Sequence, residues 1–122
     1  MLDHIGIVVG DFDKSLTFYT AALAPLGVRI VMQSAGEVGF GRDNRPQFWI
    51  HRGGAPSGRM HIAFAARNNA EVRAFHAAAL AAGGKDNGAP GLRAHYHPRY
   101  YGAFAIDLDG HNIEAVSHSP EA

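Results

Sequence analysis

Two stretches of the chain alternate between apolar residues and polar or small residues with the period of two that is typical of a β-strand. One spans residues 3–9 and the other spans residues 59–66. Each is followed by a segment whose apolar residues recur at helical spacing, and then by further short strand-like stretches. The order of these patterns predicts strand, helix and several strands, in two successive copies.

The two helical segments carry start and stop signals. The first has N-cap candidates at Asp11 and Asp13 and ends at the Pro-Leu-Gly run of residues 25–27. The second begins after the two asparagines of residues 68–69 and ends at the glycine pair of residues 83–84. Each has one apolar face, so both are predicted to cover a sheet.

The remaining strands are short and are separated by turn-forming residues. The sequence Asp-Leu-Asp-Gly at residues 107–110 is a hairpin signal between the last two. Strands are predicted at residues 28–33, 37–41 and 47–51 after the first helix, and near Arg93, at residues 101–107 and at residues 112–118 after the second. The strand near Arg93 is poorly defined by the pattern.

An internal repeat supports the two copies. Shifting the sequence by 57 residues without gaps superposes identical or similar residues in a single phase. The matches are His4 with His61, Ile5 with Ile62, Ile7 with Phe64, Phe18 with Phe75, Ala21 with Ala78, Ala22 with Ala79, Leu23 with Leu80, and Gly27 with Gly84. We therefore predict one domain, residues 1–122, in which module one (1–55) and module two (56–122) each form a βαβββ unit of an α+β fold.

Strand alternation also predicts which side chains point away from the helices. In the first strand of each module the branched and aromatic residues share one face, which leaves His4 and His61 on the other face. In the last strand Ile113 and Ala115 take the core face, so Glu114 points away from the helices, into the same cleft as His4 and His61. Two imidazoles and one carboxylate are the donor set of a catalytic metal site with open coordination positions. The sequence thus predicts one divalent ion, with zinc, manganese, iron, nickel and cobalt equally acceptable.

Composition and charge exclude several other classes of protein. There is no cysteine, so disulfides, thiolate metal sites and a cysteine nucleophile are impossible. The 11 Lys and Arg residues balance the 11 Asp and Glu residues, which argues against nucleic acid as a partner. Apolar runs such as residues 62–66 are far too short to span a bilayer, so we expect a cytoplasmic protein with no membrane association.

The repeat, the segment Leu-Asp-His-Ile-Gly-Ile-Val-Val at residues 2–9, the segment Met-His-Ile-Ala-Phe at residues 60–64, and Asp-Leu-Asp-Gly-His-Asn-Ile-Glu at residues 107–114 resemble the vicinal oxygen chelate superfamily. This superfamily contains glyoxalase I, bleomycin-resistance proteins, fosfomycin-resistance proteins and extradiol dioxygenases. The resemblance covers essentially the whole chain. It implies a glyoxalase-like fold, in which the two modules form a U-shaped mixed sheet with helices on the outer face.

The resemblance also implies where metal ligands lie. The family's ligand positions fall on His4, His61 and Glu114, and its fourth position falls on Trp49 or Ile50, neither of which can bind a metal. This departs from four-ligand glyoxalase I and agrees with three-ligand members. Two-module relatives usually form homodimers with shared sites, so His4 of one chain would join His61 and Glu114 of its partner.

Further candidates for substrate binding and catalysis gather in the loop before the last two strands, where aromatic, imidazole and guanidinium groups follow one another. In the functional interpretation this loop orients a small oxygen-rich or anionic substrate; in the alternative it is solvated and its tyrosines pack at the sheet edge. Trp49 is a candidate for the cleft wall or for stacking on substrate. The predicted substrate-binding residues are Trp49, Arg93, Tyr96 and Tyr100, and the predicted catalytic residues are Glu114 with His97 or Tyr101 as proton carrier.

These features predict a metal-dependent enzyme that chelates neighbouring oxygens of a small molecule. Lyase or isomerase chemistry is the first expectation, followed by ring-cleaving dioxygenation or thiol transfer. A metal-free binding protein of the bleomycin-resistance type is the alternative from another class, and a catalytically silent sensor using the same cleft is a third. Metal content separates the first two.

Overall fold

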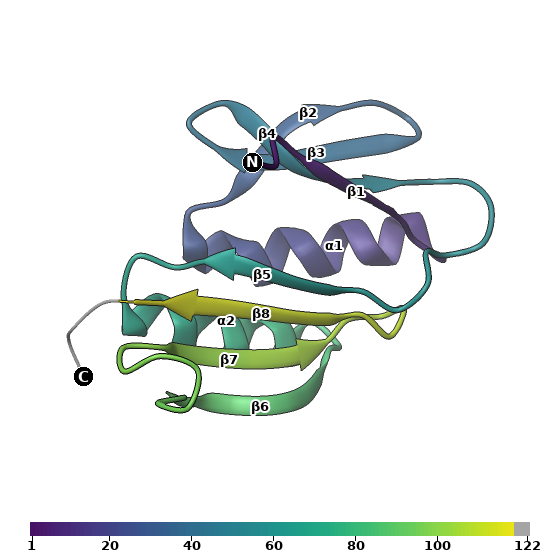
Figure 1. Ribbon diagram of the computed structural model, residues 1–122. Helices are drawn as coiled ribbons and strands as arrows, with labels where there is room; N and C mark the ends of the chain where they lie inside the picture. The colour runs from purple at the N-terminus through teal and green to yellow at the C-terminus, as the bar shows by residue number, and fades with distance from the viewer. Residues whose placement is uncertain (119–122) are drawn as a thin grey trace.

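The structure of the protein is a computed structural model that describes residues 1–118 (Figure 1). The last four residues of the predicted second module, 119–122, lie outside the described residues. The elements are β1 (Ile5–Val8), α1 (Phe12–Leu23), the 3-10 helix η1 (Ala24–Leu26), β2 (Arg29–Gln33), β3 (Glu37–Arg42), β4 (Arg45–His51), β5 (His61–Ala65), α2 (Asn69–Ala81), β6 (Lys85–Leu92), β7 (Tyr101–Ile106) and β8 (Asn112–Ser117).

The strands form two four-stranded mixed sheets of the same design. Their orders are β1-β4-β3-β2 and β5-β8-β7-β6. In each sheet the first strand runs parallel to the last, while the other neighbours are antiparallel. The predicted α+β fold of two βαβββ units is therefore confirmed.

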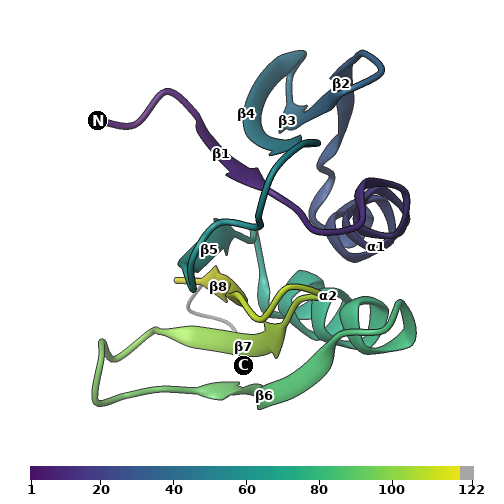
Figure 2. The same ribbon diagram turned by 90° about the vertical axis from the view of Figure 1, so that its right-hand side faces the viewer.

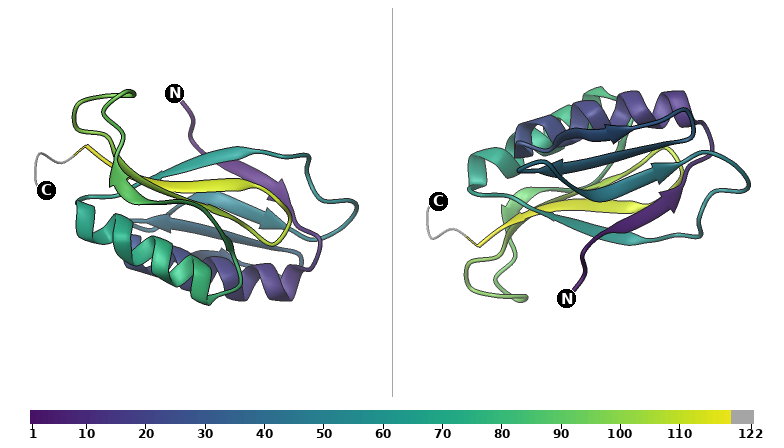
Figure 3. Two further views of the ribbon diagram at one scale, coloured as in Figure 1. Left: turned by 90° about the horizontal axis from the view of Figure 1, so that it is seen from below. Right: turned by 90° about the horizontal axis from the view of Figure 1, so that it is seen from above.

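The two helices lie side by side on one side of the molecule (Figures 2 and 3). Each covers one face of the sheet of its own module, and their apolar faces meet the inward-facing strand residues in one continuous core. The largest fully buried apolar side chains of this core are Ile7, Phe18, Tyr19, Leu23, Leu26, Phe40, Ile50, Phe75 and Ile113. The strand faces turned away from the helices are left to carry polar side chains.

Side-chain caps fix where the helices begin. The Asp11 carboxylate accepts a hydrogen bond from the backbone N–H of Lys14 at 3.0 Å, and the Asn68 side chain accepts one from Glu71 at 2.9 Å. Glu71 in turn accepts from the backbone N–H of Arg67 at 2.8 Å. These contacts satisfy N–H groups that have no partner inside the helix, so the cap residues read from the sequence start the helices as expected.

The strand expected near Arg93 lies earlier in the chain. It is β6, which ends at Leu92 and pairs with β7 through two register shifts around Gly88 and Gly91. Its sequence, Lys-Asp-Asn-Gly-Ala-Pro-Gly-Leu, is poor in residues that favour strands. An edge strand tolerates such residues because only one of its sides needs a partner, and pairing with β7 overrides the local preference.

The two modules are joined by specific contacts as well as by the chain. The buried hydroxyl of Tyr19 on α1 donates a hydrogen bond to the carboxylate of Asp107, which follows β7. The backbone N–H of Gly10 donates to the Asp109 carboxylate at 3.1 Å and 3.2 Å. These contacts fix module one against the turn between the last two strands of module two.

Candidate functional site

His61 and Glu114 meet on the face of the second sheet that is turned away from α2. They lie on the neighbouring strands β5 and β8, where Ala63 is the register partner of Glu114. The His61 Nε2 and Glu114 Oε1 atoms are 2.5 Å apart. The Glu114 side chain is only 2% exposed whereas that of His61 is 56% exposed. A carboxylate buried this far requires polar partners, and the imidazole supplies one from the open side.

Tyr100 supplies the second partner of Glu114. Its hydroxyl donates a hydrogen bond to Glu114 Oε2 at 2.6 Å. Burial, followed by the hydrogen bond to the carboxylate and the charge of that carboxylate, raises the pKa of Tyr100 to about 12. The phenol therefore keeps its proton at neutral pH and remains a donor.

A glycine makes this approach possible. A Cβ atom on Gly102 would lie 3.1 Å from the Tyr100 ring and 3.5 Å from Glu114 Oε2. The small residue at this position of β7 thus leaves room for the ring of Tyr100 to reach the carboxylate.

Phe104 is a site residue that the sequence analysis did not select. It is the register partner of Glu114 in the β7–β8 pair, and its ring lies 6.3 Å from that of His61. The signal was available, because Ala103 and Ala105 are core residues and alternation then places Phe104 on the cleft side. An aromatic side chain therefore borders the imidazole–carboxylate pair.

Arg93, a predicted substrate-binding residue, lies against Phe104 with its guanidinium carbon 5.5 Å from the ring centroid. Its two terminal nitrogens donate hydrogen bonds to the carbonyls of Gly91 and Ala89, both at 2.8 Å. The positive charge is thus fixed beside the aromatic border of the site. Its hydrogen bonds also hold Arg93 against the end of β6.

Tyr101, predicted as a proton carrier, lies on the face of β7 opposite to Glu114. It shares the helix side of β7 with Ala103 and Ala105 and packs against the core. Its hydroxyl accepts a hydrogen bond from Arg73 of α2 at 3.4 Å. Since neighbouring strand residues point to opposite faces, Tyr100 reaches Glu114 and Tyr101 does not.

The other loop candidates form an aromatic cluster beside Tyr100. The ring of Tyr96 lies 5.0 Å from that of Tyr100, and the ring of His118 lies 5.4 Å from Tyr100 and 5.5 Å from His97. His97 Nδ1 accepts a hydrogen bond from the backbone N–H of Arg99. Tyr96 and His97 are thus near the site through Tyr100 and His118.

His4, the third predicted metal ligand, lies on module one. Its Nδ1 atom is 2.8 Å from Asp3 Oδ1, and its side chain is 59% exposed. It lines a groove of about 260 Å³ whose other wall includes Ala63 and Ala65 of β5. Within residues 1–118, no three His, Asp or Glu side chains come together as a metal site. The structure therefore brings His61 to Glu114 but leaves His4 outside that pair.

The strand register identifies the module-one counterpart of Glu114. Gly6 and Ala63 are equivalent in the repeat, and their register partners are Trp49 and Glu114, respectively. Of the two candidates for the family's fourth ligand position, Trp49 and Ile50, the register therefore selects Trp49. Where module two carries a carboxylate, module one carries an indole.

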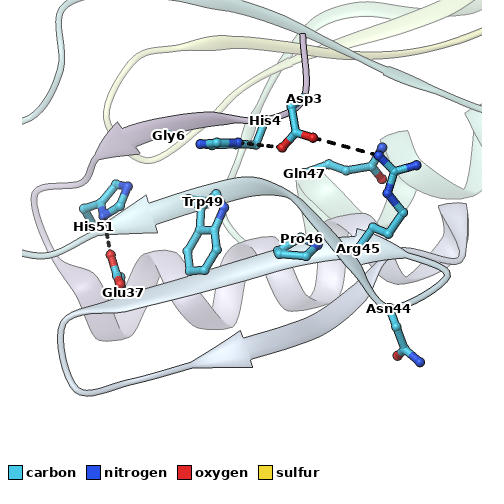
Figure 4. Close-up of a pocket in the computed structure, with 10 residues that line it drawn as sticks. All are labelled: Asp3, His4, Gly6, Glu37, Asn44, Arg45, Pro46, Gln47, Trp49 and His51. Carbon is cyan, nitrogen blue, oxygen red and sulfur yellow. Dashed lines mark hydrogen bonds and ion pairs between the residues drawn. The ribbon is translucent and has the colours of Figure 1, made fainter.

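Trp49 lines a second hollow on the open face of the first sheet (Figure 4). This cavity of about 580 Å³ also contains Asp3, His4, Glu37 and Arg45. The Asp3 carboxylate lies 3.9 Å from the Arg45 guanidinium. The open faces of both modules thus carry polar groups around aromatic side chains.

Comparison with known proteins identifies the family. The Glyoxalase/Bleomycin resistance protein/Dioxygenase superfamily model matches residues 1–115. The chain therefore belongs to this superfamily, as its repeat and sequence segments predict. No curated protein matches the chain.

Solved structures resemble the chain over nearly its full length. A glyoxalase/bleomycin resistance protein from Albidiferax ferrireducens T118 has 29% identity and a TM-score of 0.86, covering 96% of this chain and 98% of that chain. The fosfomycin resistance protein FosX from Listeria monocytogenes has 21% identity and a TM-score of 0.68, covering 100% and 94%. A family enzyme from Burkholderia phytofirmans PsJN has 15% identity and a TM-score of 0.72, covering 96% and 98%. The latter two show likeness of fold alone.

None of the helices within residues 1–118 is long and apolar enough to cross a membrane.

The donor atoms at the site suit a divalent metal in part. An imidazole nitrogen and a carboxylate oxygen on neighbouring strands are two ligands that zinc, iron, manganese, nickel and cobalt accept. The Tyr100 hydroxyl orients the carboxylate from behind, as outer partners of metal ligands commonly do. His61 and Glu114 thus fit two positions of the implied site, and a third donor must come from elsewhere.

Proposed function

We propose that the protein is a metal-dependent enzyme in which His4, His61 and Glu114 hold one divalent ion. Its first expected chemistry is that of a lyase or isomerase acting on a small molecule with neighbouring oxygens. The observation that carries this proposal is the Glu114 carboxylate, which is almost fully buried yet pairs with an imidazole and a phenol. A bound ion would polarise the chelated oxygens and stabilise negative charge that develops on them.

The chain's own residues would then divide the remaining work. Tyr100 holds Glu114 in one orientation by donating to Oε2. Phe104 and Arg93 border the site with an aromatic ring and a fixed positive charge, which suits a substrate that becomes anionic. His97 is the proposed proton carrier, because its imidazole lies in the aromatic cluster beside Tyr100 and His118.

The position of His4 supports a homodimer with shared sites. His4 lies on the open face of module one, whereas His61 and Glu114 lie on the open face of module two. In the proposed dimer, the module-one face of one chain covers the module-two face of its partner, so His4 completes the partner's ligand set. A protein of this kind would act on small molecules in the cytoplasm.

Metal content per subunit tests the proposal. Protein purified without a chelator or a His tag is compared by elemental analysis with Glu114→Gln and with the control Asp86→Asn. Asp86 is also a histidine-paired carboxylate, 2.9 Å from His76 Nε2, but it lies on β6 away from the cleft. We expect about one equivalent of a divalent metal in the wild type and the control, and loss of most of it in Glu114→Gln.

A well-folded protein that takes up no metal after reconstitution would contradict the enzyme proposal. That result would favour the alternative function, a metal-free binding protein. The cavity around Trp49 is the specific observation in favour of this alternative, because a partly exposed indole in a concave surface is suited to hold a ligand.

A further inference from the structure

The indole of Trp49 lies directly over Gly39 of the neighbouring strand β3. The two residues are register partners, and a Cβ atom on Gly39 would lie 2.9 Å from Trp49 Cζ2 and 3.0 Å from Cε2. The same Cβ would be 2.9 Å from Pro46 Cβ. Any side chain at position 39 would therefore lift the indole, so glycine is what allows it to rest close to the sheet.

A second ring lies next to the indole in the same orientation. The imidazole of His51 is two residues further along β4, with its plane 14° from that of Trp49 and its centroid 6.3 Å away. It lies over another glycine, since a Cβ on Gly6 would be 2.6 Å from His51 Nε2. Glycines on the strands to either side of β4 thus let two nearly parallel rings form an aromatic floor (Figure 4).

The charges around this floor are predominantly negative. Glu37 pairs with His51 at 3.1 Å, and Asp3 lies 2.8 Å from His4 and 3.9 Å from Arg45. Apart from its histidines, the cavity carries two carboxylates and one guanidinium. Its field therefore disfavours an anion and favours a neutral or positively charged ligand.

A partly exposed indole attracts two kinds of partner. Its face gains from offset stacking with another aromatic ring, and it attracts a cation more strongly than the other aromatic side chains do. Both partners are planar or compact groups that fit against a flat surface. A cavity of about 580 Å³ is large enough for a single ring with substituents.

We infer that this cavity binds a planar aromatic ring, uncharged or cationic, stacked on Trp49. The inference deepens the alternative function of a metal-free binding protein and rests on the open face of module one, which also carries His4, but it requires no metal. It assigns Trp49 as the specificity-determining contact and Gly39 as the residue that positions the indole.

The chain is suited to a direct test, because Trp49 is its only tryptophan. The indole N–H gives one cross-peak in a ¹H–¹⁵N NMR spectrum, and this peak reports on contact with the ring. Four probes of similar shape are titrated into the protein in the presence of EDTA: benzamide, the cation benzamidinium, the anion benzoate, and the saturated analogue cyclohexanecarboxamide.

We expect benzamide and benzamidinium to shift the indole peak saturably, with dissociation constants of about 1 mM, as befits ligands of this size. Benzoate is expected to bind at least about tenfold more weakly because of the carboxylates, and cyclohexanecarboxamide at least about tenfold more weakly because it cannot stack. Equal shifts from benzamide and cyclohexanecarboxamide, or no shift from any probe, would overturn the inference. Tighter binding of benzoate would overturn its charge preference.

Two variants locate the binding. Gly39→Ala displaces the indole and should weaken benzamide binding about tenfold, whereas Gly36→Ala, with no atom within 4 Å of the added methyl group, should leave it unchanged. Trp49→Leu, followed by the ligand's own NMR signals, should abolish binding even if Gly39→Ala fails to fold. Unaltered binding in Trp49→Leu would contradict stacking of the ligand on Trp49.

Metal dependence separates this inference from the proposed function. Benzamide binding that appears only after a divalent ion is added would place the ring at the metal site and contradict the inference. Stacking on Trp49 without metal, in a protein that also takes up no metal, would support the inference while the proposed enzyme fails.

Discussion

At the scale of single residues, the adjacent tyrosines Tyr100, which precedes β7, and Tyr101, which begins it, have different surroundings. Tyr100 donates a hydrogen bond to Glu114, whereas Tyr101 contacts Arg73 on the helix side. From the sequence, Tyr101 was predicted as a proton carrier alternative to His97 because it ends a run rich in aromatic, imidazole and guanidinium groups. An error of one position exchanges the two faces of a strand, so the choice between neighbours depends on a strand phase that the loop does not define.

Removing the Tyr100 hydroxyl should weaken metal binding. In Tyr100→Phe the Glu114 carboxylate loses the donor at Oε2, and loss of such an outer partner typically lowers metal affinity about tenfold or more. The dissociation constant for a divalent ion, measured by competition with a chromophoric chelator, checks this expectation.

Tyr101→Phe is the matched control, since the hydroxyl of this neighbouring residue lies on the helix side of β7, away from Glu114. Its metal affinity should equal that of the wild type. Equal affinities in all three proteins would remove Tyr100 from the site, while weakening in Tyr101→Phe alone would restore the original assignment.

Other residues of the candidate site were accessible from the sequence. Alternation alone placed His61 and Glu114 on the cleft side of their strands, and the structure brings these two side chains together. Phe104 was missed although the same rule applies to it. Trp49 and Ile50 remained alternatives for the fourth ligand position because the register of a parallel strand pair depends on the length of the loops between the strands. The sequence alone does not show where those loops end.

At the scale of elements, packing of α1 against the turn between β7 and β8 centres on one buried polar contact. The Tyr19 hydroxyl donates to Asp107, whose other carboxylate oxygen accepts from the backbone N–H groups of Asp109 at 2.9 Å and His111 at 2.8 Å. Burial is the main cause that raises the pKa of Tyr19 well above 10.0, and the charge of Asp107 adds to it. The phenol therefore keeps its proton in the folded state at alkaline pH.

This contact predicts how stability depends on pH. Above pH 10 the unfolded chain releases the Tyr19 proton while the folded chain retains it, so the free energy of unfolding falls by about 1.4 kcal/mol per pH unit from this group. Tyr19→Phe has no such proton. Near pH 8 it should be less stable by about 1–2 kcal/mol through loss of the hydrogen bond, and the difference should shrink above pH 10.

Urea unfolding of the wild type and of Tyr19→Phe between pH 8 and pH 11 measures this difference in the free energy of unfolding. Because Tyr100 is present in both proteins, its own ionisation affects both curves alike. Parallel stability curves across this range would show that Tyr19 does not retain its proton on folding.

The elements themselves were predicted unequally. Both helices begin at the asparagine and aspartate caps that the sequence suggested, because capping is a local interaction. The strand that is β6 was predicted too late in the chain, near Arg93, because its Gly and Pro residues favour turns. It forms a strand only through pairing with β7. Local signals therefore predict the elements that local contacts stabilise.

For the whole molecule, the 57-residue repeat was more informative than any local pattern. It predicted two units of the same design, and the two sheets have the same strand order. It did not predict how the sheets are placed, since this depends on contacts between modules. Whether His4 joins His61 and Glu114 in one site depends in turn on the pairing of two chains.

Mixing two inactive variants tests the proposed shared site. His4→Ala and Glu114→Gln each remove one ligand from every site of their own homodimers. If the ligands come from different chains, a mixed dimer has one complete site and one site that lacks both ligands, so about a quarter of the sites should be restored after subunit exchange.

Metal content of the exchanged mixture gives the answer. The double variant His4→Ala/Glu114→Gln mixed with wild type serves as the control, because no mixed dimer then has a complete shared site. No recovery in the mixture of single variants, with exchange shown by mass spectrometry, would place all three ligands within one chain.

The tie between Gly10 and Asp109 also has a mechanical consequence. It joins residues 99 positions apart, close to the two ends of the described chain, and Tyr19 is tied to Asp107 across 88 positions. A force that pulls the ends apart acts on these contacts together with the pairing of β1 with β4 and of β8 with β5 and β7, while the other strands lie in the enclosed segment. The segment that holds most of both modules should therefore extend only after the Gly10–Asp109 and Tyr19–Asp107 contacts have broken.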